Sequence, residues 1–232
     1  MHAALFDLPA VRVRHPARYS EQLLPTLAMY LHGCTRILDP FGGVGGIFAL
    51  APFLPGCQIE AVEIEPEWAG QDYRITQASA LSLPWPAATF DAVCTSPCYG
   101  NRMADHHEAR DASRRNTYRH ALGRPLHPDN AGALQWGDGY RAFHLRAWAE
   151  ARRVLAPGGR FVLNVKDHIR AGVLQPVTDW HVQALTGMGF HLVKRTEIGC
   201  PGQRCGANGH LRAPVESVIL FELVHDATAR AD

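Results

Sequence analysis

One short glycine-rich stretch constrains the fold of this chain more than any other feature. Residues 36–50 read RILDPFGGVGGIFAL, in which an apolar pair is stopped by Asp-Pro, four glycines follow, and an apolar, helix-compatible pattern resumes. Glycine has no β-carbon and permits positive φ angles, so a ligand can lie against the backbone where a helix begins. The stretch predicts a strand, a loop suited to a small molecule and a helix. A plain tight turn of an α/β protein is the alternative interpretation.

A second group suited to such a ligand follows about twenty residues later in the chain. Residues 59–64 alternate apolar with polar or small residues, which predicts a second strand, and Glu63 stands near its end. Nucleotide-binding α/β folds place a carboxylate there to accept hydrogen bonds from ribose hydroxyls, and Glu65 is a neighbouring substitute. Two ligands fit this pair of features: a dinucleotide, and S-adenosylmethionine, which carries no phosphate.

The rest of the chain alternates strands with helices, which favours a mainly parallel sheet. The last two strands have no clear helix between them, which predicts an antiparallel pair. We therefore predict an α/β fold: a Rossmann-like, seven-stranded, mostly parallel sheet with a C-terminal antiparallel edge hairpin. The expected strands are the one before the glycine loop, residues 59–64, a short one before residue 78, and residues 90–95, 160–165, 190–198 and 216–224; the main expected helices follow Ser20 and span about residues 140–155 and 180–189.

The length of 232 residues suits one domain. We expect a variable leader at residues 1–14 and a single domain at residues 15–225, with a basic insertion at about residues 101–136.

The formal net charge of +1 excludes a global commitment to nucleic acid or membrane, so any basic surface must be local. The sequence has neither a secretory leader nor an apolar run of membrane-spanning length, which predicts a cytoplasmic protein with no membrane partner.

The six cysteines predict reduced thiols and no metal site. They form no C-x-x-C pair, so a disulfide scaffold is not expected. Cys200, Cys205 and His210 lie in one loop, but their spacing matches no standard zinc site and a fourth ligand is not obvious.

Four stretches, taken in order, are similar to class I S-adenosylmethionine-dependent methyltransferases. They are HPARYS at residues 15–20, DPFGGVGG at 39–46, AVEIE at 61–65 and TSPCY at 95–99, and the run VLAPGGRFVL at 154–163 adds a helix-to-strand turn. DPF together with S-P-x-Y is more specific than the glycine motif. The chain resembles the DNA amino-methyltransferases of the N4-cytosine or N6-adenine type, in particular small phage-type enzymes. The resemblance implies S-adenosylmethionine as cofactor and DNA as partner.

The resemblance also implies which residues hold the cofactor. Glu63 takes the ribose, and Ser79 falls where related enzymes often have an acid near the adenine amino group. The residues beside the methionine part of the cofactor are Asp39, Phe41, Gly43 and Gly45.

The turn after the fourth predicted strand carries the expected chemistry. An aromatic amine is a poor nucleophile because its lone pair is delocalised into the ring. Acceptors for its two protons, here the Ser96 hydroxyl and the Pro97 carbonyl, aim the nitrogen at the activated methyl, so positioning is most of the catalysis. A base inside a duplex must be flipped out to be reached, and Tyr99 is expected to stack on it. Serine in the first position leans towards cytosine in this family.

Cys98 stands where the family usually has a second proline and raises a rival chemistry. Cytosine-C5 methyltransferases use a proline-cysteine pair whose thiolate attacks the ring. Against this, Tyr99 follows Cys98 directly, and the region of Leu163 lacks the catalytic glutamate of those enzymes. An RNA base amino-methyltransferase and a non-catalytic nucleic-acid-binding protein of the same fold also stay open, as do the recognition sequence and the oligomeric state.

The basic window that follows the turn is the expected nucleic-acid contact. Arginines with an interleaved tyrosine suit phosphate contact and base stacking, and a solvated mobile loop is the alternative. Lys166, Asp167 and His168 follow the fifth predicted strand at the same edge of the sheet and are further candidates. The substrate-binding residues we predict are Arg102, Arg114, Arg115, Tyr118 and Arg119, with Arg124 in the same window.

Overall fold

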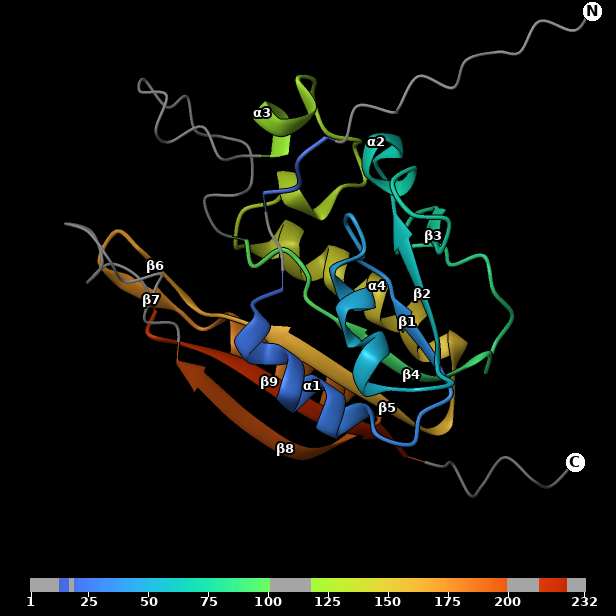
Figure 1. Cartoon of the computed structure of the whole chain (residues 1–232). Coiled ribbons are helices and arrows are strands. Elements are labelled where there is room, and N and C mark those ends of the chain that lie inside the picture. Colours follow the sequence, from blue (N-terminus) through green and yellow to red (C-terminus); the bar gives the residue numbers. More distant parts are fainter. Residues whose placement is uncertain (1–12, 17–18, 101–117, 200–212, 225–232) are drawn as a thin grey trace, which may run out of the picture.

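A seven-stranded sheet forms the centre of the molecule in the computed structural model (Figure 1), which describes residues 13–16, 19–100, 118–199 and 213–224. The strand order is β3-β2-β1-β4-β5-β9-β8. The first five strands in this order are parallel, β9 is antiparallel to β5, and β8 is antiparallel to β9. This confirms the predicted fold class. The strands are β1 (Arg36–Asp39), β2 (Gln58–Glu63), β3 (Ile75–Gln77), β4 (Phe90–Thr95), β5 (Leu155–Val165), β8 (Phe190–Gly199) and β9 (Val215–Leu223).

The sheet order places the predicted ligand loops side by side. β1 lies between β2 and β4, and Ile37 is in register with both Ile59 and Ala92. The chain leaves β1 towards β2 and later leaves β4 on the other side, so the order of strands reverses here. Open α/β sheets bind ligands in the crevice outside the carboxyl ends of the strands at such a point. The loops after β1 and β4 therefore begin at neighbouring positions of the same edge.

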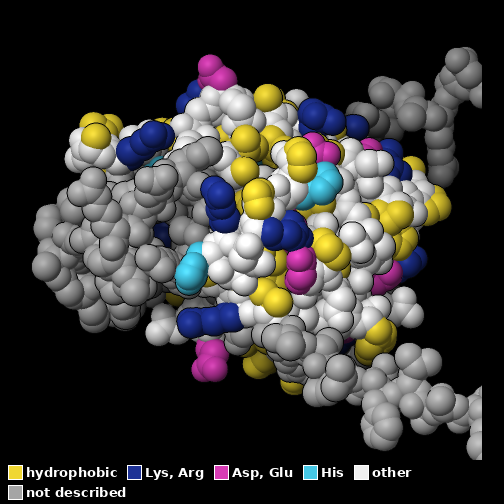
Figure 2. All heavy atoms as spheres, turned by 90° about the horizontal axis from the view of Figure 1, so that it is seen from above, with side chains coloured by type: hydrophobic (Ala, Val, Ile, Leu, Met, Phe, Trp, Pro, Cys, Tyr) yellow, Lys and Arg dark blue, Asp and Glu magenta, His cyan; other side chains and the backbone are white. Residues whose placement is uncertain are grey.

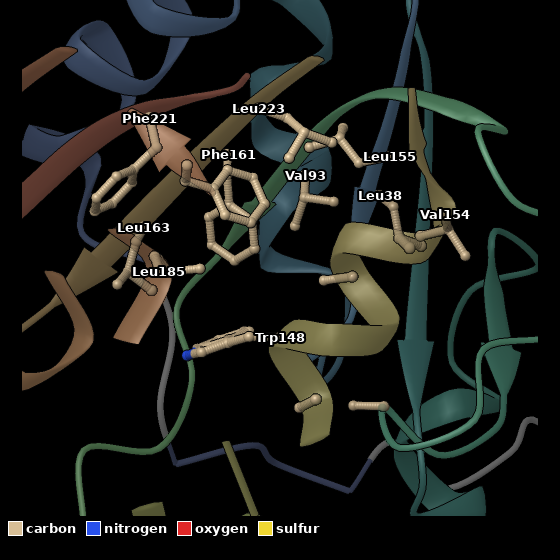
Figure 3. Close-up of a cluster of buried hydrophobic side chains, with 14 of the residues drawn as sticks. Leu38, Val93, Trp148, Val154, Leu155, Phe161, Leu163, Leu185, Phe221 and Leu223 are labelled. Carbon is tan, nitrogen blue, oxygen red and sulfur yellow. The ribbon is translucent and has the colours of Figure 1, made fainter. Parts of the chain in front are cut away.

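Helices cover both faces of the sheet. Figure 1 shows α1 and α4 on opposite faces. Leu27, Leu31 and Ile47 belong to the apolar layer on the α1 face, and Trp148 and Leu185 to the layer on the α4 face (Figure 3). Burying each such side chain stabilises the fold by about 1.5–3 kcal/mol. The helices are η1 (Glu21–Leu23), α1 (Leu24–Leu31), η2 (Gly46–Phe53), α2 (Pro66–Ala69), α3 (Tyr118–Leu122), η4 (Ala131–Ala133), α4 (Asp138–Val154) and α5 (Val177–Gly187).

Several boundaries differ from the sequence-based predictions, for local reasons. The helix after the glycine loop is a 3-10 helix containing Pro52, whose missing N–H and bulky ring disfavour α-helical bonding. Strand β5 begins at Leu155 rather than at residue 160, since the Pro-Gly-Gly run continues the strand with Gly158 at a φ of 76°. Helix α5 begins at Val177, three residues earlier than expected, and the Asp167 carboxylate accepts a hydrogen bond from the Thr178 N–H in its first turn.

A second, two-stranded sheet was not predicted. β6 (His168–Arg170) and β7 (Val173–Gln175) form an antiparallel hairpin. Its two turn residues, Ala171 and Gly172, both have positive φ angles, as a tight hairpin turn requires. Such short strands carry too little hydrophobic alternation to be read from sequence. None of the helices in the described ranges combines the length and the apolar character needed to cross a lipid bilayer.

Candidate active site

A cavity of about 380 Å³ opens at the carboxyl ends of the parallel strands. Its walls come from the loop after β1, the end of β2, the turn after β4, and residues between α3 and α4. Clefts of this size at the switch point of an α/β sheet are the usual place for a small-molecule site. The structure thus brings both predicted motifs into one cavity. The predicted site residues that line it are Phe41, Gly43, Glu63, Ser96, Pro97, Tyr99 and Tyr118.

Glu63 is held firmly by the glycine loop. Its carboxylate accepts hydrogen bonds from the Gly43 N–H (3.0 Å) and from the Glu65 N–H (2.8 Å). Gly43 has a φ of 54°, and a β-carbon there would come within 3.1 Å of the His15 ring. Burial raises the pKa of Glu63 to about 7, against the opposing effect of these backbone hydrogen bonds. The cavity therefore holds a rigid carboxylate that titrates near neutral pH.

Asp39 and Gly45 support the loop from behind, and neither lines the cavity. The Asp39 carboxylate accepts hydrogen bonds from the Thr95 hydroxyl (2.7 Å) and the Phe41 N–H (3.0 Å), so it ties the ends of β1 and β4 together. Burial raises the pKa of Asp39 to about 6. At Gly45 the φ angle is 84°, and a β-carbon would lie 2.4 Å from the Phe48 ring. Both residues thus shape the loop that carries the cavity-lining Phe41 and Gly43.

Ser79 does not occupy the predicted position at the cavity wall. Its neighbours Ala78 and Ala80 line the cavity, whereas Ser79 does not. The Ser79 hydroxyl instead accepts a hydrogen bond from the Leu81 N–H at 3.2 Å, closing a local turn. The structure therefore gives Ser79 a role in the backbone of this loop.

The turn after β4 is connected to β5 by a buried amide. The Ser96 and Tyr99 hydroxyls lie 2.7 Å apart. Asn164 Nδ2 donates to both, at 3.2 Å to Ser96 and 3.1 Å to Tyr99. Asn164 is 2% exposed and lines the cavity. Sequence reasoning did not select Asn164, although a lone polar residue inside the apolar run FVLNV was a usable signal.

Two buried charges continue the polar wall beyond Asn164. Glu216 of β9 has a carboxylate oxygen 3.5 Å from Asn164 Nδ2, and the Lys166 ammonium lies 3.9 Å from its other oxygen. Lys166 was a candidate for substrate contact and does line the cavity, as does Glu216. Asp167 instead contacts the start of α5, and His168 lies in β6. Glu216 was not predicted because its position depends on the pairing of β9 with β5.

A chain of hydrogen bonds supports the turn from the α4 side. Trp148 Nε1 donates to His181 Nδ1 at 3.1 Å, and His181 Nε2 lies 2.9 Å from the Tyr140 hydroxyl. An indole N–H can only donate, so Nδ1 is an acceptor and the Nε2 proton points to the Tyr140 oxygen. The Tyr140 hydroxyl then donates to the Cys98 carbonyl at 2.7 Å. Burial lowers the pKa of His181, which keeps the imidazole neutral as this direction requires.

The Cys98 thiol is not set up as a nucleophile. Burial raises the pKa of Cys98 to about 11, and the charge of Glu63 adds to the effect. The nearest hydrogen-bond partner is the Tyr118 hydroxyl, 3.5 Å from the sulfur. A nucleophilic cysteine needs an environment that lowers the thiol pKa. The surroundings of Cys98 do the opposite.

The described part of the basic window packs onto α2 rather than presenting a row of free arginines. Arg124 makes ion pairs with Glu65 (2.7 Å) and Glu67. Glu65 is fully buried and also accepts hydrogen bonds from the His127 N–H and from Asn130 Nδ2, at 2.8 Å each. In the structure Arg124 therefore neutralises the buried Glu65 carboxylate, with 35% of its own side chain exposed. Glu65 is not a second ribose acceptor, because its oxygens are already engaged.

The other predicted substrate-binding residues differ in burial and in location. Tyr118 is buried, lines the cavity and packs against the rings of His15 and Trp68. Arg119 is exposed on α3. Figure 2 views this end of the molecule and shows Lys and Arg side chains spread singly among acidic and hydrophobic ones over the described surface. Arg102, Arg114 and Arg115 lie outside the described residues.

The prediction that no metal is bound concerned three residues of one loop. Cys200, Cys205 and His210 lie outside the described ranges. Within those ranges, no group of three or more His, Cys, Asp or Glu side chains is arranged to hold a metal ion.

Comparison with known proteins defines the fold. No protein-family model and no curated protein matches the chain. Among solved structures, a 1,6-didemethyltoxoflavin-N1-methyltransferase from Burkholderia thailandensis, crystallised with S-adenosylhomocysteine, is 17% identical with a TM-score of 0.53, over 88% of this chain and 79% of that one. The N-methyltransferase NodS from Bradyrhizobium japonicum is 15% identical with a TM-score of 0.51, over 87% of this chain and 93% of that one. The chain has the class I S-adenosylmethionine-dependent methyltransferase fold.

This fold does not by itself decide the chemistry. The [4+2]-cyclase SpnF is similar to the chain at a TM-score of 0.55, with 15% identity over 91% of this chain and 84% of that one. A cyclase and methyltransferases thus share this architecture, so function has to be argued from the residues of the cavity.

Proposed function

We propose that this protein is an S-adenosylmethionine-dependent methyltransferase that methylates an exocyclic amino group of a base in DNA, cytosine N4 or adenine N6. The domain would span residues 15–225. The observation that carries the proposal is that one cavity is lined both by the loop and carboxylate suited to the cofactor, Gly43 and Glu63, and by the turn suited to an aromatic amine, Ser96 and Pro97.

The chemistry of the first wall suits the cofactor. Glu63 offers carboxylate oxygens to ribose hydroxyls and is fixed by two backbone N–H groups. The Trp68 Nε1 donor is buried at the same cavity and has no hydrogen-bond partner among the described residues, so a ligand atom can take it. Phe41 and Gly43 would lie beside the methionine part. The cofactor, when bound, supplies a methyl group activated by the sulfonium charge.

The second wall would hold the acceptor base. Ser96 Oγ and the Pro97 carbonyl accept the two amine protons and so direct the nitrogen lone pair towards the methyl group. The amide of Asn164 fixes the Ser96 hydroxyl, and the chain Trp148–His181–Tyr140 fixes the peptide between Cys98 and Tyr99. Tyr99 would stack on the flipped base, with its hydroxyl held by the same amide.

The environment of Cys98 argues against the cytosine-C5 alternative. That reaction needs a thiolate near neutral pH, and burial raises the pKa of Cys98 to about 11. Leu163, at the place where those enzymes carry a glutamate, is fully buried in the core. RNA as substrate and binding without turnover are distinguished by the experiment that follows.

Nucleoside mass spectrometry on cells that express the protein tests the proposal. DNA and RNA from these cells should be digested and compared with those from cells expressing Tyr99→Ala and Ser96→Ala. We expect N4-methylcytosine or N6-methyladenine in the DNA of cells with the unchanged chain alone. Methylated bases confined to RNA would replace DNA by RNA as the substrate. Calorimetry with S-adenosylmethionine on the purified protein tests the alternative of a nucleic-acid-binding protein without turnover. Failure to bind the cofactor would overturn the proposal.

A further inference from the structure

The polar wall beyond Ser96 has the composition of a recognition surface. Asn164, Lys166 and Glu216 are only 2%, 8% and 6% exposed, and all three line the cavity. β5 and β9 pair with Asn164 opposite Val218 and Val165 opposite Ser217, so the three side chains share one face of the sheet. Burying charged groups is costly unless they are paired or serve a site. Their place at the cavity favours a role toward a ligand.

The side chains of this wall lie close to one another and to the catalytic turn, with the ammonium group at the cavity. Lys166 Nζ lies 3.9 Å from the Glu216 carboxylate, beyond hydrogen-bond length but close enough for charge compensation. Asn164 Nδ2 lies between the Glu216 carboxylate (3.5 Å) and the Ser96 hydroxyl (3.2 Å). A flat ring whose amine rests at Ser96 therefore has its adjacent edge within reach of this wall.

We infer that Asn164, Lys166 and Glu216 read the ring edge of the acceptor base and that this base is cytosine. The inference rests on the proposed function and narrows its substrate. Next to its amine, cytosine presents N3 and O2, which both accept hydrogen bonds. An ammonium group with three donors suits two such acceptors, and Glu216 balances the charge of Lys166.

The other bases match this wall less well. Adenine presents one acceptor, N1, beside its amine and then a C–H group. Guanine presents an N–H donor on one side of its amine, which a lysine ammonium cannot accept, and a single acceptor, N3, on the other. Unpaired polar groups in a buried site are a strong source of discrimination. From this donor and acceptor pattern, we expect kcat/KM to be highest for cytosine, lower for adenine and lowest for guanine.

The test combines a protein change with a change in the base. Random-sequence DNA first identifies the methylated base and its site by mass spectrometry and sequencing. Synthetic DNA of that site is then made with cytosine or with 3-deazacytosine, in which a C–H group replaces N3. Lys166→Met should lower kcat/KM on cytosine about 10- to 100-fold, the range for a hydrogen bond to a charged group. The control Lys194→Met, at an exposed position of β8, should leave it unchanged.

The losses in kcat/KM caused by Lys166→Met and by 3-deazacytosine should not be additive. If Lys166 contacts N3, the unchanged protein should lose a similar factor on 3-deazacytosine, and Lys166→Met should lose little more on that base. Full additivity of the two losses would overturn the inference, as would N6-methyladenine or N2-methylguanine as the main product. These outcomes leave the methyltransferase proposal standing, whereas loss of cofactor binding and of all methylation in the unchanged protein would remove both.

A second variant separates recognition from folding. Lys166→Met alone removes the positive charge 3.9 Å from the buried Glu216 carboxylate, which is destabilising. The double variant Lys166→Met/Glu216→Leu removes both charges and should regain thermal stability and cofactor affinity. Its methylation of cytosine should stay low. Recovery of methylation together with stability would show that the pair serves the fold and would overturn the inference.

Discussion

The hydroxyl group of Tyr140 donates a hydrogen bond of 2.7 Å to the carbonyl oxygen of Cys98, from a fully buried position behind the candidate catalytic turn. The donor is oriented by His181, whose tautomer is in turn fixed by the Trp148 indole. Helices α4 and α5 thereby hold the peptide between Cys98 and Tyr99, one residue after Pro97. Because catalysis by positioning is sensitive to small displacements, this contact should affect methyl transfer more than cofactor binding.

Tyr140→Phe tests this expectation. The substitution keeps the ring and removes one buried hydrogen bond, so kcat should fall about tenfold, corresponding to about 1.4 kcal/mol. The Kd of S-adenosylmethionine should change by less than about twofold. Stopped assays and calorimetry supply the two numbers. Tyr30→Phe is the matched control, since it removes a tyrosine hydroxyl bonded to Thr196 (2.6 Å) elsewhere in the fold. Equal effects of the two variants on kcat would rule out a positioning role.

Cys98→Ala should retain methyl transfer to the base. Burial raises the pKa of this thiol to about 11, so it contributes almost no thiolate at neutral pH. We expect kcat to stay within about threefold of the unchanged protein, whereas Ser96→Ala should lose an amine acceptor and about tenfold or more. Both variants are to be compared by product analysis. Loss of all activity in Cys98→Ala, with 5-methylcytosine as the product of the unchanged protein, would contradict this prediction and the proposed chemistry.

Cofactor affinity should rise with pH through about 7. Burial raises the pKa of Glu63 to about 7, so the carboxylate that would accept ribose hydroxyls becomes ionised only as the pH passes this value. Titration calorimetry between pH 5.5 and 8.5 should give a decreasing Kd, and Glu63→Gln should bind more weakly with a flatter pH profile. Glu60→Gln, on the same strand but away from the cavity, is the control. A Kd independent of pH in the unchanged protein would refute the assignment.

The stability of the free protein should depend on pH with the opposite sign. A carboxyl whose folded pKa is raised contributes stability below its unfolded value, 4.5, and this contribution is lost as the pH rises through about 7. The gap corresponds to about 3 kcal/mol if Glu63 acted alone. Glu63→Gln should therefore gain stability relative to the unchanged protein between pH 4.5 and 7.5, as measured by urea unfolding. A constant difference across this range would show that Glu63 does not titrate there.

The positions of the glycine loop after β1 and of the turn after β4 could be predicted from sequence. They depend on local residue pattern and on the rule that parallel strands end at one edge of the sheet. Strand ends were marked by Asp39 and Thr95, and parallel strands β1 and β4 place their carboxyl ends at the same edge. Glycine at residues 43 and 45 indicated a loop with backbone conformations that other residues rarely adopt. Both glycines do have positive φ angles. This much of the site is encoded by spacing and residue type.

The remaining wall could not be predicted because it depends on pairing between distant segments. Glu216 reaches the cavity only because β9 inserts antiparallel between β5 and β8, and a shift of one residue would turn it to the other face. His181 and Tyr140 meet through the packing of two helices whose relative register has no sequence signature. Ser79 was placed by analogy, and its hydroxyl is used by a local turn instead.

Arg124 connects the described part of the basic window to the cofactor wall, and its loss should destabilise the fold. Glu65 is fully buried, and Arg124→Met would leave its carboxylate without the guanidinium. Breaking a fully buried pair costs about 3 kcal/mol, and an exposed pair is worth at most about 1 kcal/mol. The Arg124 side chain is 35% exposed and Glu65 keeps two other donors, so the expected loss lies between these values, at about 2 kcal/mol. Urea unfolding at pH 7 measures the difference. Arg195→Met, which removes a guanidinium paired with two exposed carboxylates, is the matched control.

The same variant should weaken cofactor binding through a defined contact. The Glu65 N–H donates to the Glu63 carboxylate at 2.8 Å, so movement of Glu65 displaces the proposed ribose acceptor. Arg124→Met/Glu65→Gln removes the buried charge and should recover most of the lost stability, and with it the Kd of S-adenosylmethionine. If Arg124 instead serves DNA phosphates, both variants should weaken DNA binding equally, with a reduced salt dependence, and leave the free energy of unfolding unchanged.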